Sequence, residues 1–380
     1  MYNINTHYTN IFNLAKSMVK DPALMYLHPH GATEINNLET MHVESNDKLH
    51  MSDAFIICYD QEPLIPSYNT PVFSHINAKL TSFLRFRPII LLNTELDSDD
   101  KEVILSEYNY VDCYYFHHIF AAHDWFRDYY YNKQITPVNE RTLSKKFISM
   151  NRLTSNARVY RTLLVNEFIK HDLVNDGHVS YSRNCPLGGD SIQQLLDNGH
   201  NYNIPTKLIN EVVTNIGNST NHFRIDFPDA EFIPNRSFSL DPIPTFMESF
   251  LHIVAETNYW GRKKHLTEKI FKPIILKQPF ILVGCANNLA YLKSYGFKTF
   301  DKWWSEDYDN ITDDIQRMHI IGDTIKEICN YSLPQLEDML KEMQEVLDYN
   351  FHLFYSREFI DNAWNELETN LKTAISQVNS

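Results

Sequence analysis

The stretch SFLHIVAETNYWGRKKHLTEKIFKPIILKQPFILVG, residues 249–284, holds two apolar runs separated by a basic loop and a helical segment. The runs, 249–257 and 279–284, are nearly continuous in apolar residues, which is typical of strands buried on both faces. The segment TEKIFKPIILK, 267–277, has the composition of a short helix. A strand, a helix and a second strand in this order predict a parallel sheet.

Three apolar runs nearer the N-terminus repeat this pattern. They are AFIICYD (54–60), RPIILLNTE (87–95) and KKFISMN (145–151). The last is followed by a segment with helical spacing, 157–174, and by a short strand, 178–182. Repeated strand–helix units predict an α/β fold, whose ligands bind beyond the carboxyl ends of the strands. The polar residues after each run are therefore the candidates for a site.

The length of 380 residues suits two domains of ordinary size. We expect an N-terminal domain over 1–144, a second domain over 145–312, and C-terminal helices over 313–380 that pack back on the domains. The first boundary follows from the polar residues around Pro137, and the second from the heptad-like apolar residues that begin after Asp313.

Net charge, cysteine spacing and hydropathy limit the classes of protein to which this chain can belong. A formal net charge of −14 argues against a nucleic-acid coat protein, although it leaves room for a local basic groove. Five separated cysteines without a CxxC pair indicate reduced thiols. No signal-peptide pattern and no apolar run of about eighteen residues occurs, so we expect a cytoplasmic protein without a membrane span. Abundant Asn, Ile, Lys and Tyr fit an AT-rich genome, either of a low-GC bacterium or of a phage, and a phage protein would act in the host cytoplasm.

The polar residues of the 249–284 stretch indicate a site for a nucleoside diphosphate. Thr267 is the expected N-cap, and Glu268 and Lys269 would occupy the first turn of the helix. Lys269 and the free N–H groups at a helix start suit a diphosphate, and a carboxylate beside them suits the hydroxyls of a ribose. The alternative interpretation is an ordinary helix start with a surface Glu–Lys pair.

At this block the chain resembles the inverting fucosyltransferase family and related two-domain glycosyltransferases. The shared order is a strand that ends at Glu256, then Asn258, then Thr-Glu-Lys at 267–269 opening a helix, then an apolar strand. The resemblance covers roughly 250–310. It departs from the family in the basic spacer 260–265, which is longer and more charged than usual.

The resemblance implies a GT-B fold, in which two Rossmann-like domains face each other across a cleft. It implies that Glu268 binds the ribose or donor sugar, that Lys269 binds the diphosphate, and that Glu256, Asn258 and Thr267 line the same pocket. The co-substrate would be a nucleotide-sugar such as a UDP- or GDP-sugar. Transfer would proceed with inversion and without a metal ion or other cofactor.

The block KKFISMNRLTSNARVYRTLL, 145–164, offers arginines for the donor phosphates. Family members commonly place an arginine here, because a guanidinium matches phosphate oxygens in a bidentate geometry. Arg152 follows the expected strand and is the first candidate, and Arg161 is the second. For Arg158, a solvated helix charge is the preferred interpretation.

The exit of the run CYDQEPLIP, 58–66, supplies two carboxylates. Inverting transfer needs a general base that takes the proton of the attacking acceptor hydroxyl. Glu62 is the expected base and Asp60 the reserve. The alternative is turn chemistry, since Asp and Pro are common where strands end.

The acceptor is left open by the sequence. For a phage protein, a hydroxymethylated pyrimidine in double-stranded DNA is a candidate, with Arg262, Lys263 and Lys264 against the phosphates. For a bacterial protein, a cell-surface glycan or a protein side chain is the alternative. Two further hypotheses remain. The chain could be a non-catalytic module that binds a nucleotide-sugar, or it could be a structural protein.

Other polar groups have simpler interpretations. The acids of Asp97-Ser98-Asp99-Asp100 are expected to cap and solvate a helix start instead of binding manganese. The histidines at 28 and 30, and at 117, 118 and 123, do not have a spacing that specifies zinc. Their aromatic neighbours suggest packed or cleft-lining side chains.

Overall fold

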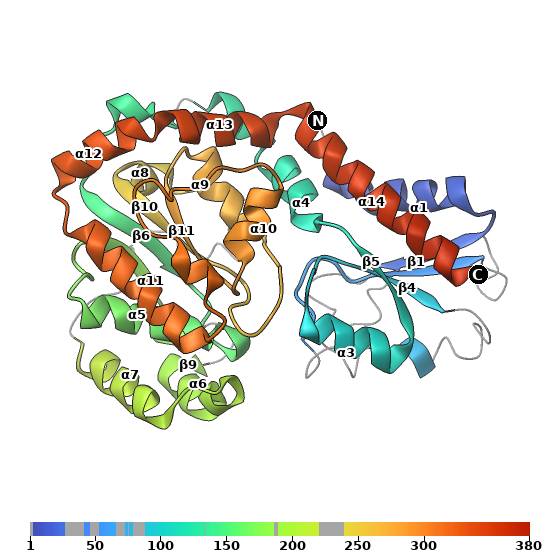
Figure 1. Cartoon of the computed structure of the whole chain (residues 1–380), viewed down its shortest axis with the longest axis horizontal. Coiled ribbons are helices and arrows are strands. Elements are labelled where there is room, and N and C mark those ends of the chain that lie inside the picture. The colour runs from blue at the N-terminus through green and yellow to red at the C-terminus, as the bar shows by residue number, and fades with distance from the viewer. Residues whose placement is uncertain are drawn as a thin grey trace. The chain divides into compact units, whose positions relative to one another are not determined.

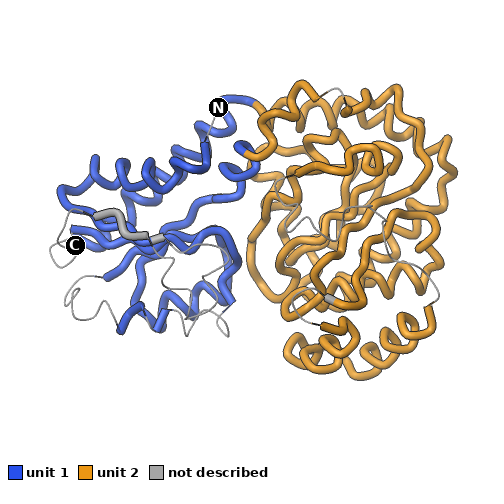
Figure 2. The backbone as a smooth tube through the Cα atoms, turned by 180° about the vertical axis from the view of Figure 1, so that it is seen from behind, with its two compact units in different colours: residues 1–124, 356–380 blue, residues 125–355 orange. Residues whose placement is uncertain are grey.

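The computed structural model describes residues 3–26, 42–45, 53–65, 73–74, 76–78, 88–132, 134–185, 189–219 and 239–380. The chain forms an α/β protein that divides into two compact units (Figure 2). Unit 1 comprises Met1–Asp124 and Ser356–Ser380, and unit 2 comprises Trp125–Tyr355. Among the described residues, no helix has both the length and the apolar character needed to cross a membrane.

Unit 1 contains a five-stranded sheet with the order β2-β1-β3-β4-β5. Its strands are β1 (Pro22–Tyr26), β2 (His42–Ser45), β3 (Ala54–Cys58), β4 (Ile89–Asn93) and β5 (Tyr110–Tyr114). Strand β2 is antiparallel to β1, and all other neighbours are parallel. Every residue of β3 and β4 is buried, as their continuous apolar composition requires.

Helices cover both faces of this sheet (Figure 1). They are α1 (His7–Met18), α3 (Asp99–Tyr108) and α14 (Arg357–Val378), and α4 (His117–Trp125) follows β5. Helix α14 contacts β4, β5 and α1, and α3 lies on the opposite face of the sheet. Ser98 caps α3 by accepting a hydrogen bond from the Lys101 N–H, with acids in the first turn, which confirms the capping interpretation of this segment.

Unit 2 contains a fully parallel sheet with the order β11-β10-β6-β7. Its strands are β6 (Lys145–Asn151), β7 (Gly177–Tyr181), β10 (Ser249–Ala255) and β11 (Phe280–Val283), and a separate small pair joins β8 (Asn184–Cys185) to β9 (Gly189–Asp190). The longer helices are α5 (Tyr160–Lys170), α6 (Ser191–Asn198), α7 (Thr206–Asn218), α11 (Asp314–Cys329), α12 (Leu333–Glu342) and α13 (Gln344–Tyr355). Shorter ones are α8 (Ile243–Met247), η8 (Glu268–Ile270), α9 (Phe271–Ile275) and α10 (Asn288–Ser294).

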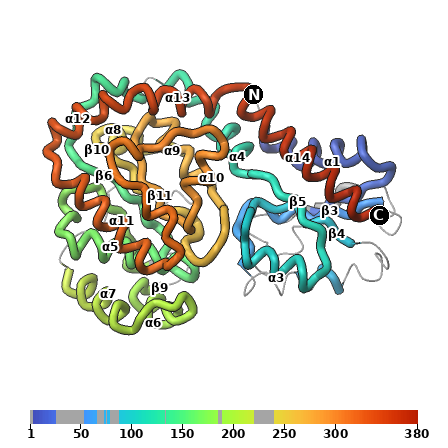
Figure 3. Tube along the Cα trace, in the orientation of Figure 1, coloured from blue at the N-terminus to red at the C-terminus, as the bar shows by residue number. Residues whose placement is uncertain are grey.

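The division into units differs from the ranges expected from the sequence. The first boundary lies at 124/125, whereas the sequence places it at 144/145. The helices after residue 313 do not all belong to the same unit. Helices α11, α12 and α13 belong to unit 2, and α14 belongs to unit 1 (Figure 3). Strand β6 therefore begins well inside unit 2.

Gly177 at the start of β7 gives a test of packing in the unit 2 sheet. A Cβ at this position would lie 2.3 Å from Cε2 of the buried Phe147 ring on the neighbouring strand. We expect Gly177→Ala to lower the free energy of unfolding by about 1–3 kcal/mol, because a packed ring must move. Urea denaturation measures the change. Gly217→Ala in α7 is the control, since a Cβ there meets nothing within 4 Å and should be neutral or slightly stabilising. Equal effects of the two substitutions would contradict the prediction.

Candidate functional site

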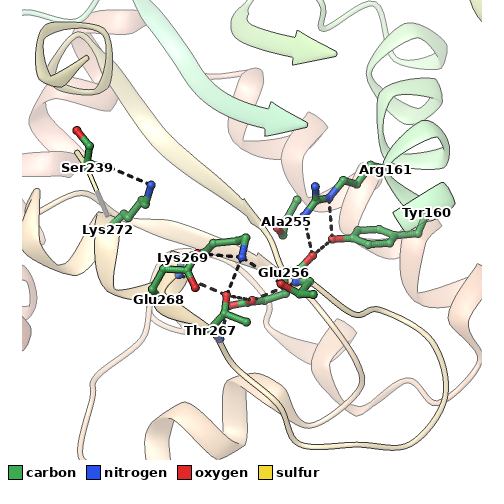
Figure 4. A network of polar contacts seen from close by, with 10 residues as sticks. Tyr160, Arg161, Ser239, Ala255, Glu256, Thr267, Glu268, Lys269 and Lys272 are labelled. Atoms are coloured by element: carbon green, nitrogen blue, oxygen red, sulfur yellow. Dashed lines mark hydrogen bonds and ion pairs between the residues drawn. The ribbon is translucent and has the colours of Figure 1, made fainter. Parts of the chain in front are cut away.

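The carboxyl ends of the four parallel strands in unit 2 lie along one edge of the sheet. Glu256 follows β10 at this edge, and Thr257 follows Glu256. The loop after β10 then leads to Thr267, whose side-chain oxygen accepts the Lys269 N–H and caps η8. The edge of the sheet and the start of η8 are thus joined in one polar cluster (Figure 4).

Glu256 is the buried carboxylate of this cluster, which also contains Thr267, Glu268 and Lys269. Its carboxylate accepts hydrogen bonds from the Thr267 hydroxyl at 2.6 Å and from the N–H groups of Thr267 and Thr257, each at 3.3 Å. Burial raises the pKa of Glu256, and the nearby Lys269 ammonium opposes that rise. Because Glu256 is fully buried, it fixes the position of Thr267 instead of presenting an oxygen to a ligand.

Lys269 is the most accessible charged group of the cluster, with 30% of its side chain exposed. Its ammonium donates to the hydroxyls of Thr257 and Thr267, both at 3.0 Å, and to the Glu268 carboxylate at 3.1 Å. Burial works to raise the pKa of Glu268, but Lys269 and Lys272 outweigh it and hold that pKa below its usual value. Glu268 is therefore an ionised acceptor beside a partly exposed cation.

Arg161 stabilises the cluster through the backbone at the end of β10. Its buried guanidinium donates to the backbone carbonyls of Leu153, Ala255 and Glu256 at 2.9–3.0 Å. The Tyr160 hydroxyl also donates to the Glu256 carbonyl. These bonds hold the end of β10, so Arg161 positions the strand instead of presenting a guanidinium to a phosphate. Arg152, the other candidate from the sequence, is exposed just after β6.

The loop after β10 is more buried than its basic sequence predicts. Lys263 is only 1% exposed, while Arg262 is exposed and Lys264 is partly exposed. The Asn258 amide donates to the Trp260 carbonyl and to Cys285 Sγ, so it stabilises the loop and the turn after β11. Of the three basic residues expected to contact phosphates, Lys263 is thus unsuited to a surface contact.

Arg317 on α11, which no sequence motif marks, organises this loop. Its guanidinium donates to the carbonyls of Gly284, Ile311 and Tyr259 and to the Asp314 carboxylate. The same guanidinium lies 4.4 Å from the centre of the Tyr259 ring, which stacks on Tyr160. A single arginine in a long helix carries no sequence signal for such a role.

The two carboxylates expected to act as a base lie in unit 1 and differ in environment. Asp60 is 1% exposed, and both of its oxygens accept hydrogen bonds from tyrosine hydroxyls, those of Tyr8 and Tyr115. Glu62 is partly exposed two residues later. The loop is held again at Leu64, whose N–H donates to Glu95 at 2.7 Å. Glu62 thus lies on a short loop that is fixed on both sides.

Comparison with known proteins adds no assignment. No family model matches the chain, and neither a curated protein nor a solved structure matches it.

Proposed function

We propose that the chain is a glycosyltransferase that binds a nucleotide-sugar at the carboxyl edge of the unit 2 sheet. The observation that carries the proposal is the cluster of Glu256, Thr267, Glu268 and Lys269, in which a partly exposed ammonium adjoins an ionised carboxylate. Lys269 would contact the diphosphate and Glu268 the hydroxyls of the ribose or sugar. The proposed arrangement of the two units is that of a GT-B enzyme.

The proposed reaction is a single displacement with inversion at the sugar. Glu62 removes the proton of the acceptor hydroxyl while its oxygen forms a bond to the anomeric carbon. The bond from that carbon to the diphosphate breaks, and the nucleoside diphosphate leaves with the electron pair. Lys269 stabilises the negative charge that develops on the leaving group. Arg152 is exposed and is the remaining arginine candidate for the same phosphates.

For the acceptor, we propose a hydroxyl on a large substrate, with a hydroxymethylated pyrimidine of DNA as the first candidate. Arg262 and Lys264 are the loop residues with enough exposure to reach phosphates. DNA binding by these residues would weaken steeply with salt, because phosphate contacts release counterions. A salt-independent affinity for DNA would redirect the search to glycans and protein side chains.

Lys269→Met is the direct test of the donor site. A thermal-shift panel of UDP, GDP, CDP and their sugars first identifies the nucleotide, and repetition with EDTA checks that binding needs no metal ion. We expect the substitution to weaken binding of the selected nucleotide about 10- to 150-fold, since a charge-assisted hydrogen bond contributes about 1.5–3 kcal/mol. Isothermal titration calorimetry measures the loss.

Lys341→Met on α12 is the matched control for this substitution. Lys341 pairs with Asp338 on the surface, away from the cluster in sequence and contacts, so its loss should leave affinity unchanged. Absence of binding by the whole nucleotide panel would overturn the proposed function. Full affinity in Lys269→Met would remove Lys269 from the diphosphate site.

A further inference from the structure

Unit 1 contains a second polar cluster that the proposed transfer reaction does not use. His7 and Tyr8 come from the start of α1, Asp60 follows β3, and Tyr115 and His117 lie between β5 and the first turn of α4. The side chains of His7, Asp60, Tyr115 and His117 are all buried. Three segments that are distant in sequence thus bring imidazole, carboxylate and phenol groups together in the interior.

The Tyr115 hydroxyl is at the centre of this cluster. It lies 2.8 Å from His7 Nε2 and 2.8 Å from His117 Nδ1, and it donates to Asp60 Oδ2. His117 Nδ1 is also 3.7 Å from Asp60 Oδ2. One ligand atom from each of His7, Asp60 and His117 lies within 4.8 Å of the other two. The donor atoms therefore converge on one small volume.

The charge of the cluster is unusual for a protein interior. A buried carboxylate is costly unless it is paired with a positive charge or coordinates a metal ion. Within the described part of the chain, the hydrogen-bond and ion-pair partners of Asp60 are phenols and an imidazole instead of lysine or arginine side chains. Two imidazole nitrogens and a carboxylate oxygen form a donor set that suits first-row divalent metals such as zinc.

We propose that His7, Asp60, His117 and Tyr115 form a binding site for a divalent transition-metal ion, with Zn²⁺ as the expected occupant. The ligand atoms are His7 Nε2, His117 Nδ1, Asp60 Oδ2 and the Tyr115 phenol oxygen. Each imidazole then carries its single proton on the other ring nitrogen, and the phenol releases its proton to solvent. One Zn²⁺ and the two anionic oxygens give a neutral site.

The dimensions of the cluster agree with this assignment. Zinc bonds of about 2.0–2.1 Å place tetrahedral ligands about 3.3 Å apart. The two histidine–Tyr115 separations of 2.8 Å and the His117–Asp60 separation of 3.7 Å lie around that value. The Tyr115 and Asp60 oxygens are hydrogen-bonded and lie closer, so they would move apart when the ion replaces the shared proton. Tyr8 holds the other oxygen of Asp60 at 2.8 Å and accepts a hydrogen bond from the Gln61 amide. An outer hydrogen bond of this kind to a ligand carboxylate is a regular feature of metal sites.

The site would join α1 to the carboxyl ends of β3 and β5, since His7 comes from α1 and the other ligands follow those strands. It is separate from the proposed nucleotide-binding cluster of Glu256, Thr267, Glu268 and Lys269, which lies in unit 2. The two proposals can therefore fail independently: nucleotide binding should persist after EDTA treatment, whereas zinc binding should not.

The experiment is a zinc measurement on the full chain. Protein purified without chelator is analysed by mass spectrometry for metals, and EDTA-treated protein is titrated with Zn²⁺ in a calorimeter and in a thermal melt. We expect about one equivalent of zinc per chain and a rise in melting temperature when Zn²⁺ is restored. Co²⁺ in place of Zn²⁺ should give the visible absorption of a four-coordinate site.

Variants separate this site from adventitious zinc. His117→Gln and Tyr115→Phe should lose most of the zinc, while His178→Gln should retain it. His178 pairs with Glu248 in unit 2 and serves as the matched control. Wild-type protein that holds no zinc and shows no response to added Zn²⁺ would overturn the proposal, and this test does not depend on the folding of any variant. Zinc retained at full occupancy by folded His117→Gln would also overturn it.

Discussion

Exchange of Glu62 for Gln is expected to lower turnover about 10²- to 10⁴-fold, which is the usual contribution of a general base. Glutamine keeps the size and polarity of the side chain but cannot take a proton from the acceptor. Glu62 lies between Asp60 and Leu64, which are held by the buried Tyr115 and Glu95, so the loop should keep its conformation. Release of the nucleoside diphosphate from the donor, with water as acceptor, measures the loss.

Two measurements give this prediction its control. Donor affinity should remain within about twofold of the wild type, because Glu62 removes a proton only in the reaction step. Glu107→Gln, an exposed carboxylate on α3, should leave both turnover and affinity unchanged. If turnover is unaltered in Glu62→Gln while donor binding is intact, the base is another residue and the role assigned to Glu62 is wrong.

Replacement of Arg317 by Met should lower the free energy of unfolding by about 3–5 kcal/mol, because three backbone carbonyls lose a donor at about 1–3 kcal/mol per group. The side chain is 1% exposed, and its loss removes the guanidinium donor of three backbone carbonyls. The Asp314 carboxylate loses its ion pair and keeps the hydrogen bond from the Gly261 N–H. The Tyr259 ring also loses its cation contact. Urea denaturation measures the change, and nucleotide affinity should fall with it because the loop after β10 loses its support.

Arg357→Met on α14 is the comparison for Arg317. Arg357 pairs with Asp361, but its side chain is 91% exposed, so its removal should change stability by less than about 0.5 kcal/mol. A loss of less than about 1 kcal/mol in Arg317→Met would show that the backbone holds this loop without the guanidinium.

Strands with continuous apolar runs could be predicted from the sequence. The runs 54–60, 87–95 and 145–151 correspond to β3, β4 and β6, and the stretch 249–284 contains β10, α9 and β11 as expected. These predictions are confirmed, and for the fully buried β3, β4, β10 and β11 the reason is that a strand buried on both faces has few polar positions to break the pattern. The grouping of Glu256 with Thr267 and Lys269 also follows from the short distance between them in the chain.

Features that depend on distant partners could not be predicted in this way. The apolar stripe of α14 indicates a packed helix, but it does not say that the partner is β5. The sequence predicts that Arg262, Lys263 and Lys264 contact phosphates, yet tertiary packing buries Lys263. The sequence indicates Asp60 only as a reserve base, because nothing in its local sequence shows that His7 and His117 converge on it. The residues His28 and His30 lie outside the described part of the chain.

The return of α14 to the first sheet has a consequence for biosynthesis. The strands of unit 1 leave the ribosome early, but the helix that covers β4 and β5 is synthesised only after all of 125–355. Unit 2 is continuous and can close while synthesis proceeds, whereas the sheet of unit 1 waits with one face incompletely covered. The N-terminal part of this protein is thus the last to be completed, and a ribosome that stops before residue 356 leaves an apolar sheet exposed to chaperones and proteases.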